Sequence, residues 1–129
     1  MELALADAGI GAEQVRQVNA HGTSTPLNDA AEAAAITKVF GSPGPAVTST
    51  KGVTGHALGA AGALEAAAVL LSMEHRLIPP TAGTTTPDPE LTIDLVYGEP
   101  RPWEPAPAMS NNFGFGGHNG CVVIGPPPA

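Results

Sequence analysis

Two histidines stand where their side chains could act on a reactant. His21 follows a run rich in β-formers (Val15–Ala20) and precedes a glycine, so we expect it at a strand end, where side chains of open α/β sheets reach a crevice. His56 stands at the expected N-terminus of a long apolar helix. There, the helix dipole and unpaired N–H groups disfavour the imidazolium. Two neutral imidazoles that donate to one oxygen would form an electrophilic clamp for a developing enolate or oxyanion.

A lysine and a glutamate flank the second histidine. Lys51 precedes His56 by five residues, and Glu65 follows it by nine, inside the apolar helix. A buried carboxylate is costly without a partner, and Lys51 is the natural cation for it. We therefore expect a Lys51–Glu65 ion pair near the histidines, where Lys51 would also stabilise negative charge.

The same residues admit other interpretations. A single histidine at a strand end is more often a hydrogen-bonded structural residue, and a lysine before a helix is usually solvated. His21, His56 and His118 could bind zinc, but no two of them have a close ligand spacing, so no metal site is predicted. Residues 51–56 (KGVTGH) differ from a phosphate-binding loop because the lysine precedes the glycines. Cys121 lies in a strand-like apolar run, which favours an inert buried thiol.

The elements that would position these residues alternate between helix and strand, and strands cluster at the end of the chain. Helices are predicted at residues 2–8, about 27–40 and about 56–75. Strands are predicted at residues 15–20, 46–49, 93–96, 108–111 and 121–124, the last of them buried. Thr25 is the expected N-cap of the second helix, and the third is apolar on all sides, which is typical of a buried helix. This order favours an α/β fold with a mixed sheet.

Composition excludes several classes of protein. The net charge is −7, and the five Lys and Arg residues are scattered, so nucleic-acid binding is not expected. A single cysteine excludes an internal disulfide framework and suits a reducing cytoplasm. The longest apolar stretch, 57–73, contains Glu65 and is short for a membrane span, and no secretory signal is visible. We expect a cytoplasmic protein that contacts neither nucleic acid nor membrane.

Three motifs occur in a characteristic order: NAHGTSTPLNDAAE, then STKGVTGHALGAAGALEAA, then, after IPPT, SNNFGFGGHNG. Together they resemble the β-ketoacyl-acyl-carrier-protein synthases (ketosynthases) of bacterial fatty-acid and polyketide synthesis. The resemblance extends from about Leu3 to Ile124. It implies the C-terminal half of a thiolase-like fold, in which two similar halves related by a pseudo-dyad stack in αβαβα layers.

The resemblance also assigns roles to residues. It makes His21 and His56 the active-site histidines that polarise the malonyl thioester carbonyl, and Lys51 and Glu65 the buried ion pair that orders them. Phe115 would be a gate whose glycine neighbours let it swing. The residues implied for substrate binding and gating are Thr23, Thr25, Asn111, Phe113, Gly114, Phe115, Gly116 and Gly117. Thr23 and Thr25 would contact the phosphopantetheine arm of the carrier protein.

The chain departs from the family pattern in three places. The family's nucleophilic cysteine belongs to the first half of the fold, and no such segment is present in these residues. We therefore expect residues 1–129 to be one C-terminal half-domain that is inactive without the nucleophile-bearing half. Asn112 stands where serine is common, and His118 where threonine is also found.

Two functions remain in competition. The first is the C-terminal half of an enzyme for decarboxylative Claisen condensation of an acyl thioester with malonyl carrier protein. The second is a non-catalytic acyl- or pantetheine-binding or scaffold subunit that pairs with a ketosynthase. The presence of His21, His56 and Lys51 favours the first. The chain is expected to bind no cofactor of its own. Its expected partners are the acyl carrier protein, which carries substrates on phosphopantetheine, and either the N-terminal half or a second copy.

Overall fold

The computed structural model describes residues 1–127, which form a five-stranded mixed sheet in the order β4-β2-β1-β6-β7. The strands are β1 (Gln17–Asn19), β2 (Ala46–Thr48), β4 (Asp94–Leu95), β6 (Ala108–Phe113) and β7 (Asn119–Ile124). The first four of these run parallel to their neighbours, whereas β7 pairs antiparallel with β6. The α/β class and the mixed sheet predicted from the sequence are confirmed.

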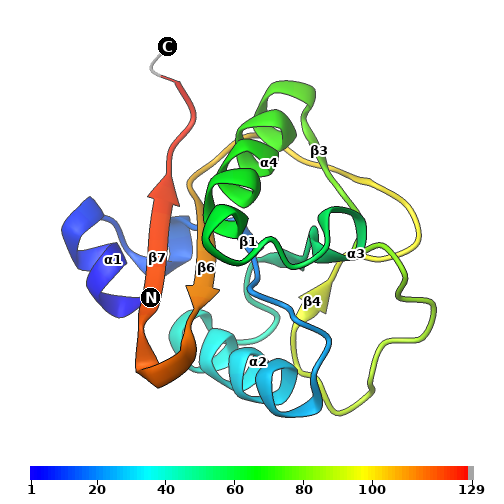
Figure 1. Ribbon diagram of the computed structural model, residues 1–129. Helices are drawn as coiled ribbons and strands as arrows, with labels where there is room; N and C mark the ends of the chain where they lie inside the picture. Colours follow the sequence, from blue (N-terminus) through cyan, green and yellow to red (C-terminus); the bar gives the residue numbers. More distant parts are fainter. Residues whose placement is uncertain (128–129) are drawn as a thin grey trace.

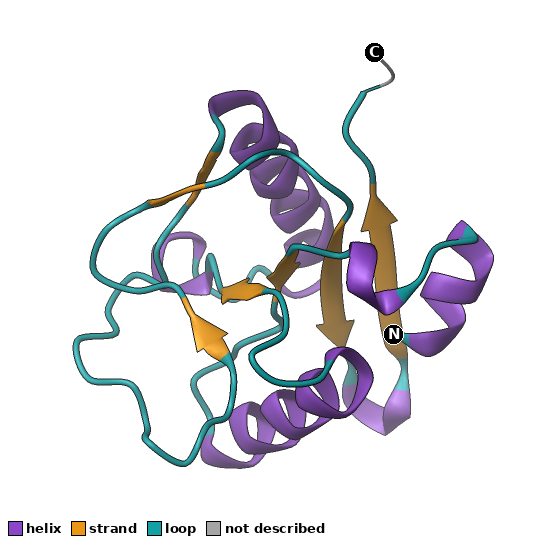
Figure 2. Cartoon of the chain, turned by 180° about the vertical axis from the view of Figure 1, so that it is seen from behind, coloured by secondary structure: helices purple, strands orange, loops and turns teal. Residues whose placement is uncertain are grey.

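Helices lie on both faces of the sheet (Figure 1). The helices are α1 (Glu2–Ala8), α2 (Pro26–Phe40), α3 (Lys51–Thr54) and α4 (Ala61–His75). Short 3₁₀ turns occupy Ala12–Gln14, Leu58–Ala60 and Phe115–Gly117. To one side of the main sheet, β3 (Leu77–Ile78) and β5 (Arg101–Pro102) form a small antiparallel pair that the sequence did not predict (Figure 2). Among the described residues, no helix has the length and hydrophobicity that a membrane span requires.

The strands divide their side chains between two layers because successive residues of a strand point to opposite faces. Val18 and Met109 join a core with Ile36 of α2. Their strand neighbours face the other way: Gln17 accepts a hydrogen bond from Ser72 of α4 (2.8 Å), and Ala108 packs on α4. This alternation decides which residues at the strand ends face α2 and which face α4.

The predicted strands and the first two helices are present, with small differences at their ends. α2 starts at Pro26, which is suited to a first helical position. Thr25 occupies the N-cap position, as predicted, but its hydroxyl lies 3.0 Å from that of Thr23 and bonds no helix N–H. β1 is shorter than the predicted run 15–20 because a 3₁₀ turn precedes it.

The prediction that the third helix begins at His56 is wrong. Lys51–Thr54 form a separate short helix that ends at Gly55, whose positive φ of 68° breaks the helical path. A 3₁₀ turn follows, and α4 starts only at Ala61. His56 therefore lies in the connection between two helices, and the helix-dipole argument does not apply to it.

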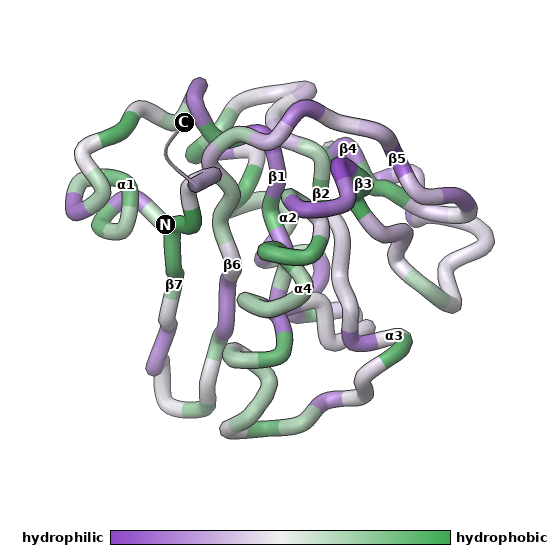
Figure 3. The backbone as a smooth tube through the Cα atoms, turned by 90° about the horizontal axis from the view of Figure 1, so that it is seen from above, coloured by the Kyte–Doolittle hydropathy of each residue, from purple (hydrophilic) through white to green (hydrophobic). Residues whose placement is uncertain are grey.

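Two elements are less buried than the sequence suggested. α4 buries Glu65, Val69 and Met73, but Leu70 and Leu71 are about half exposed on the opposite side. β7 is an edge strand beside β6 and against α1, so it is not the buried strand that its apolar residues predicted (Figure 3). In both cases, periodicity reports how apolar an element is, whereas burial depends on what covers it.

Candidate active site

His21 lies just beyond the carboxyl end of β1, and its backbone is held by a buried carboxylate. The backbone N–H groups of His21 and Gly22 donate to the two oxygens of Glu32 at 2.8 and 2.9 Å. Asn111 Nδ2 donates to the same carboxylate at 3.3 Å. Burial raises the pKa of Glu32, and these hydrogen bonds act in the opposite direction. Glu32 therefore fixes the path of the chain that carries His21.

The sequence analysis missed the role of Glu32, although a signal was available. Glu32 lies one helical turn before Ile36, on the stripe of α2 that packs against the sheet, and it is 3% exposed. A carboxylate on the apolar stripe of a helix requires hydrogen-bond donors. The nearest donors are the backbone groups of the HG dipeptide, which no periodicity places beside α2.

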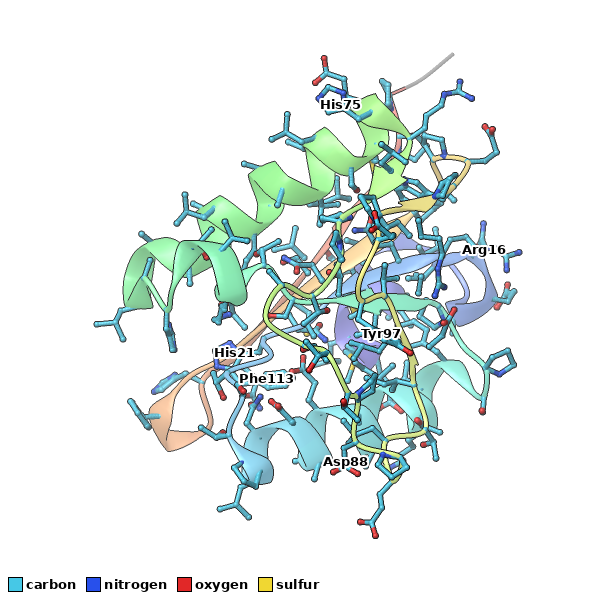
Figure 4. The ribbon with its side chains drawn as sticks, turned by 90° about the vertical axis from the view of Figure 1, so that its right-hand side faces the viewer. Arg16, His21, His75, Asp88, Tyr97 and Phe113 are labelled. Carbon is cyan, nitrogen blue, oxygen red and sulfur yellow. The ribbon has the colours of Figure 1, made fainter. Side chains whose placement is uncertain are left out.

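The imidazole of His21 is at the centre of a compact cluster. Its ring centroid is 5.4 Å from that of His56, with the two planes at 85°, and 5.6 Å from that of Phe113. Figure 4 shows His21 and Phe113 side by side, with His75 at the far end of α4. His21 is buried, whereas His56 is exposed. The structure thus brings together two histidines that are 35 residues apart in the sequence.

Beneath His21 lies a buried ion pair. Lys51 Nζ contacts Glu65 Oε1, and both side chains are almost fully buried. Lys51 Nζ also lies 3.4 Å from His21 Nδ1, and Asn112 Nδ2 donates to Glu65 Oε2 at 2.6 Å. The ion pair predicted from the sequence is present, and its lysine faces the histidine.

The hydrogen bonds show which ring nitrogen of each histidine accepts. A lysine ammonium can only donate, so His21 Nδ1, which faces Lys51 Nζ, is the acceptor. His56 Nδ1 accepts from the backbone N–H of Leu58 at 3.2 Å. In each neutral ring, the proton is therefore on Nε2. Each imidazole then has a donor to offer to a substrate oxygen.

The environment keeps His21 neutral. Burial lowers the pKa of His21, and the positive charge of Lys51 and the neighbouring His56 lower it further. Glu65 and hydrogen bonding to Asn112 act in the opposite direction. Because the pKa lies below its ordinary value of 6.5, the ring is a neutral hydrogen-bond donor at pH 7.

A cavity of about 450 Å³ adjoins the cluster, between α2 and the segment 81–95. Thr23, Ser49, Lys51 and His56 are among its lining residues, and so is Leu91. It has both polar and apolar walls. Thr23 is half-buried in this wall, whereas Thr25 is exposed.

The remaining predicted residues surround the cluster less closely. Asn111 is fully buried and faces Glu32. Phe113 is half-buried against His21, but Phe115 is 99% exposed and contacts neither histidine here. Gly116 and Gly117 have φ of 74° and 84°, which glycine adopts readily, and Gly114 donates its N–H to the His118 carbonyl at 2.8 Å.

Known proteins of one family resemble this chain. The model of the β-ketoacyl synthase C-terminal domain matches residues 1–85. The chain is 48% identical over 126 residues to 3-oxoacyl-[acyl-carrier-protein] synthase 2 of Coxiella burnetii, and 46% identical to that of Staphylococcus aureus. Each match covers 96% of this chain but only 30% and 31% of the relative, so the chain spans about a third of their length.

Solved structures agree with these sequence matches. A β-ketoacyl synthase from Burkholderia phymatum superimposes with a TM-score of 0.91 at 42% identity, over 95% of this chain and 30% of that one. The ishigamide ketosynthase/chain length factor superimposes with a TM-score of 0.92 at 38% identity, over 96% of this chain and 31% of that one. A type II polyketide ketosynthase in complex with its acyl carrier protein superimposes with a TM-score of 0.88 at 35% identity, over 96% of this chain and 31% of that one. With its paired histidines, buried Lys51–Glu65 pair and mixed sheet, the chain belongs to the β-ketoacyl synthases and corresponds to their C-terminal domain.

Proposed function

We propose that this chain is the C-terminal part of a condensing enzyme that joins an acyl thioester to a malonyl thioester with loss of carbon dioxide. The observation that carries the proposal is the pair of imidazoles with ring centroids 5.4 Å apart, each of which faces a donor at Nδ1 and so carries its proton on Nε2. The thioester carbonyl oxygen of a malonyl group placed between the rings would accept from both His21 and His56.

The chemistry follows from that placement. The bond between the malonyl carboxylate and the α-carbon breaks, and its electron pair moves into the thioester as an enolate. Two Nε2–H donors stabilise the enolate oxygen, a contribution that is largest in a site closed to water. The enolate carbon then attacks the acyl thioester carbonyl, a new carbon–carbon bond forms, and the thiolate that held the acyl group leaves.

The acyl group requires a thiol from outside the site described here. Cys121, the chain's single cysteine, lies on β7 and shares no contact with the histidines. We propose that a segment beyond these 129 residues supplies the nucleophile, in the same polypeptide or in a partner. The acyl group would enter past Phe115, whose exposed ring and flanking glycines suit a gate.

A carrier protein is the proposed source of both substrates. The names of the relatives include an acyl carrier protein, and one of the matched structures is a ketosynthase in complex with its acyl carrier protein. In this chain, Thr23 lines the cavity beside the histidines and its hydroxyl lies 3.0 Å from that of Thr25, which supports assigning both to contact with a phosphopantetheine arm. The chain itself would hold no resident cofactor.

The direct test is malonyl decarboxylation by the assembled enzyme that contains this chain, because that half-reaction needs no acylated thiol. Carbon dioxide release from malonyl carrier protein is measured for the parent protein and for His21→Ala and His56→Ala. Loss of one oxyanion donor is expected to reduce the rate about 100-fold. His75→Ala is the matched control, because His75 is exposed at the far end of α4 and should keep the parent rate.

A parent protein that pairs stably with a ketosynthase yet releases no carbon dioxide would contradict the enzymatic proposal. It would favour the second function, a non-catalytic subunit. A ketosynthase in complex with its chain length factor is among the structures that resemble this chain, so pairing with a second subunit has a precedent in the fold.

A further inference from the structure

Two consecutive asparagines at the end of β6 bind two different buried glutamates. Asn111 donates to Glu32 of α2 at 3.3 Å, whereas Asn112 donates to Glu65 of α4 at 2.6 Å. Because successive strand residues point to opposite faces, the two amides reach opposite layers of the protein. The end of β6 is thus tied to the helices on both sides, and one of these ties reaches the ion pair beneath His21.

The first turn of α4 leaves room for the amide of Asn112. Gly62 has no side chain there, and a Cβ on it would come within 3.4 Å of Asn112 Nδ2. Asn112 itself is only half-buried, yet its amide reaches a carboxylate that is 1% exposed. The hydrogen bond from Asn112 to Glu65 is short and charge-assisted, and it forms where β6 and α4 are in contact. These features indicate a specific contact.

We propose that Asn112 is a positioning residue that holds Glu65, and through Glu65 the ammonium of Lys51, in place beneath His21. The inference rests on the proposed function and deepens it, since it concerns the same two histidines. Glu65 has two oxygens, and each has one partner: Oε1 contacts Lys51 and Oε2 accepts from Asn112. Without the amide, Oε2 would lose the donor that orients the carboxylate, and Lys51 would no longer be held 3.4 Å from His21 Nδ1.

The neutral charge of Asn112 matters as much as its hydrogen bond. The charged or titratable groups that face His21 are Lys51 of α3, His56 after it, Glu65 of α4 and Glu32 of α2. The groups around His21 thus include two carboxylates and one ammonium. The positive charge of Lys51 lowers the pKa of His21, so the position of that ammonium affects the titration of the ring. A substitution at position 112 should therefore change the titration of His21, which a purely structural contact would not.

The experiment measures the pKa of His21 by NMR of its ring protons in the assembled protein, for the parent, Asn112→Leu and Asn112→Asp. Asn112→Leu removes the hydrogen bond to Glu65 at similar size and releases Lys51, whose positive charge lowers the pKa of His21, so this pKa is expected to rise. Asn112→Asp adds a negative charge at the same place, so the pKa is expected to rise by about one unit. Asn119→Asp is the matched control: Asn119 is exposed on β7 opposite Phe113, so the same charge change should leave the His21 pKa near its parent value.

The acid limb of the pH profile for malonyl decarboxylation should move with the His21 pKa in both variants. If either variant fails to fold, Asn112→Ser replaces it, since serine keeps a polar group but is too short to reach Glu65; the expected shift is again upward. Unchanged His21 titration in the folded variants would overturn the positioning role. That result differs from failure of the proposed function, in which the parent protein releases no carbon dioxide while the NMR shifts still occur.

Discussion

His21 depends on two buried glutamates, and each acts on a different part of it. Glu32 holds the backbone of His21 and Gly22, whereas Glu65 holds the lysine that faces the ring. The first interaction places the imidazole, and the second directs a donor to its Nδ1, so that the Nε2 proton is left for a substrate. The orientation of the His21 side chain thus depends on carboxylates from two helices on opposite faces of the sheet.

Glu32→Ala should destabilise the protein and disorder the His21 segment. The change leaves two backbone N–H groups and the Asn111 amide without their acceptor, and one such buried group costs about 2 kcal/mol. Because the pKa of Glu32 is raised in the folded state, the glutamate stabilises most below its ordinary pKa of 4.5, and this contribution declines as the pH rises. Urea unfolding at pH 5 and pH 8 should therefore show the larger loss at pH 5.

Glu74→Ala provides the comparison for that experiment. Glu74 is exposed on α4, and surface substitutions of this kind usually change the free energy of unfolding by less than about 0.5 kcal/mol. Equal, small effects of both substitutions would show that the Glu32 carboxylate does not hold the His21 segment.

At the scale of elements, the short helix α3 decides where Lys51 and His56 lie. It begins directly at Lys51, it ends at Gly55, and Gly52 in its first turn packs against the segment that follows β3. A Cβ at position 52 would lie 2.1 Å from the Ala82 carbonyl oxygen, a distance that requires the backbone to move. Because position 52 is a glycine, α3 can lie this close to Ala82.

Gly52→Ala is expected to push α3 away from Ala82 and to move Lys51 from beneath His21. We expect a decrease of about tenfold or more in malonyl decarboxylation, since small misplacements of positioning groups cost rate steeply. Gly59→Ala is the matched control, because a Cβ there meets nothing within 4 Å and its φ is not in the left-handed region. Parent-like activity of Gly52→Ala, or an equal loss in Gly59→Ala, would show that the approach of α3 to Ala82 does not position the site.

At the scale of the whole molecule, α4 has one face on the sheet and one face with exposed leucines. Leu64, Leu70 and Leu71 are 44%, 55% and 52% exposed. Beside them lies a second, mainly apolar cavity of about 440 Å³, lined by Val53, Leu71 and Leu77 among others. Contiguous apolar surface of this kind usually marks an interface. The chain spans about 30% of its relatives, so a further segment or a second copy is the expected cover.

Residues 1–129 expressed alone should therefore form a dimer or larger aggregates, and Leu70→Glu should change that assembly. A closed twofold contact between copies would bury the α4 face in a self-complementary way. Sedimentation velocity over a range of protein concentrations measures the oligomeric state. Leu3→Glu is the control, since Leu3 is 87% exposed on α1, away from α4. A well-folded, monodisperse monomer at high concentration would contradict the prediction.

The amino-acid sequence determined the order of helices and strands, the mixed α/β class and the Lys51–Glu65 pair. These follow from local rules: periodicity predicts an element, and a carboxylate in an apolar helix requires a cation. Only the tertiary structure decided that a 3₁₀ turn separates His56 from α4, that Glu32 holds the His21 backbone, and that Asn112 reaches Glu65. Each of these depends on contacts between segments remote in sequence, where strand ends and helix faces meet. Local propensity has no information about which side chains meet there, because packing selects those partners.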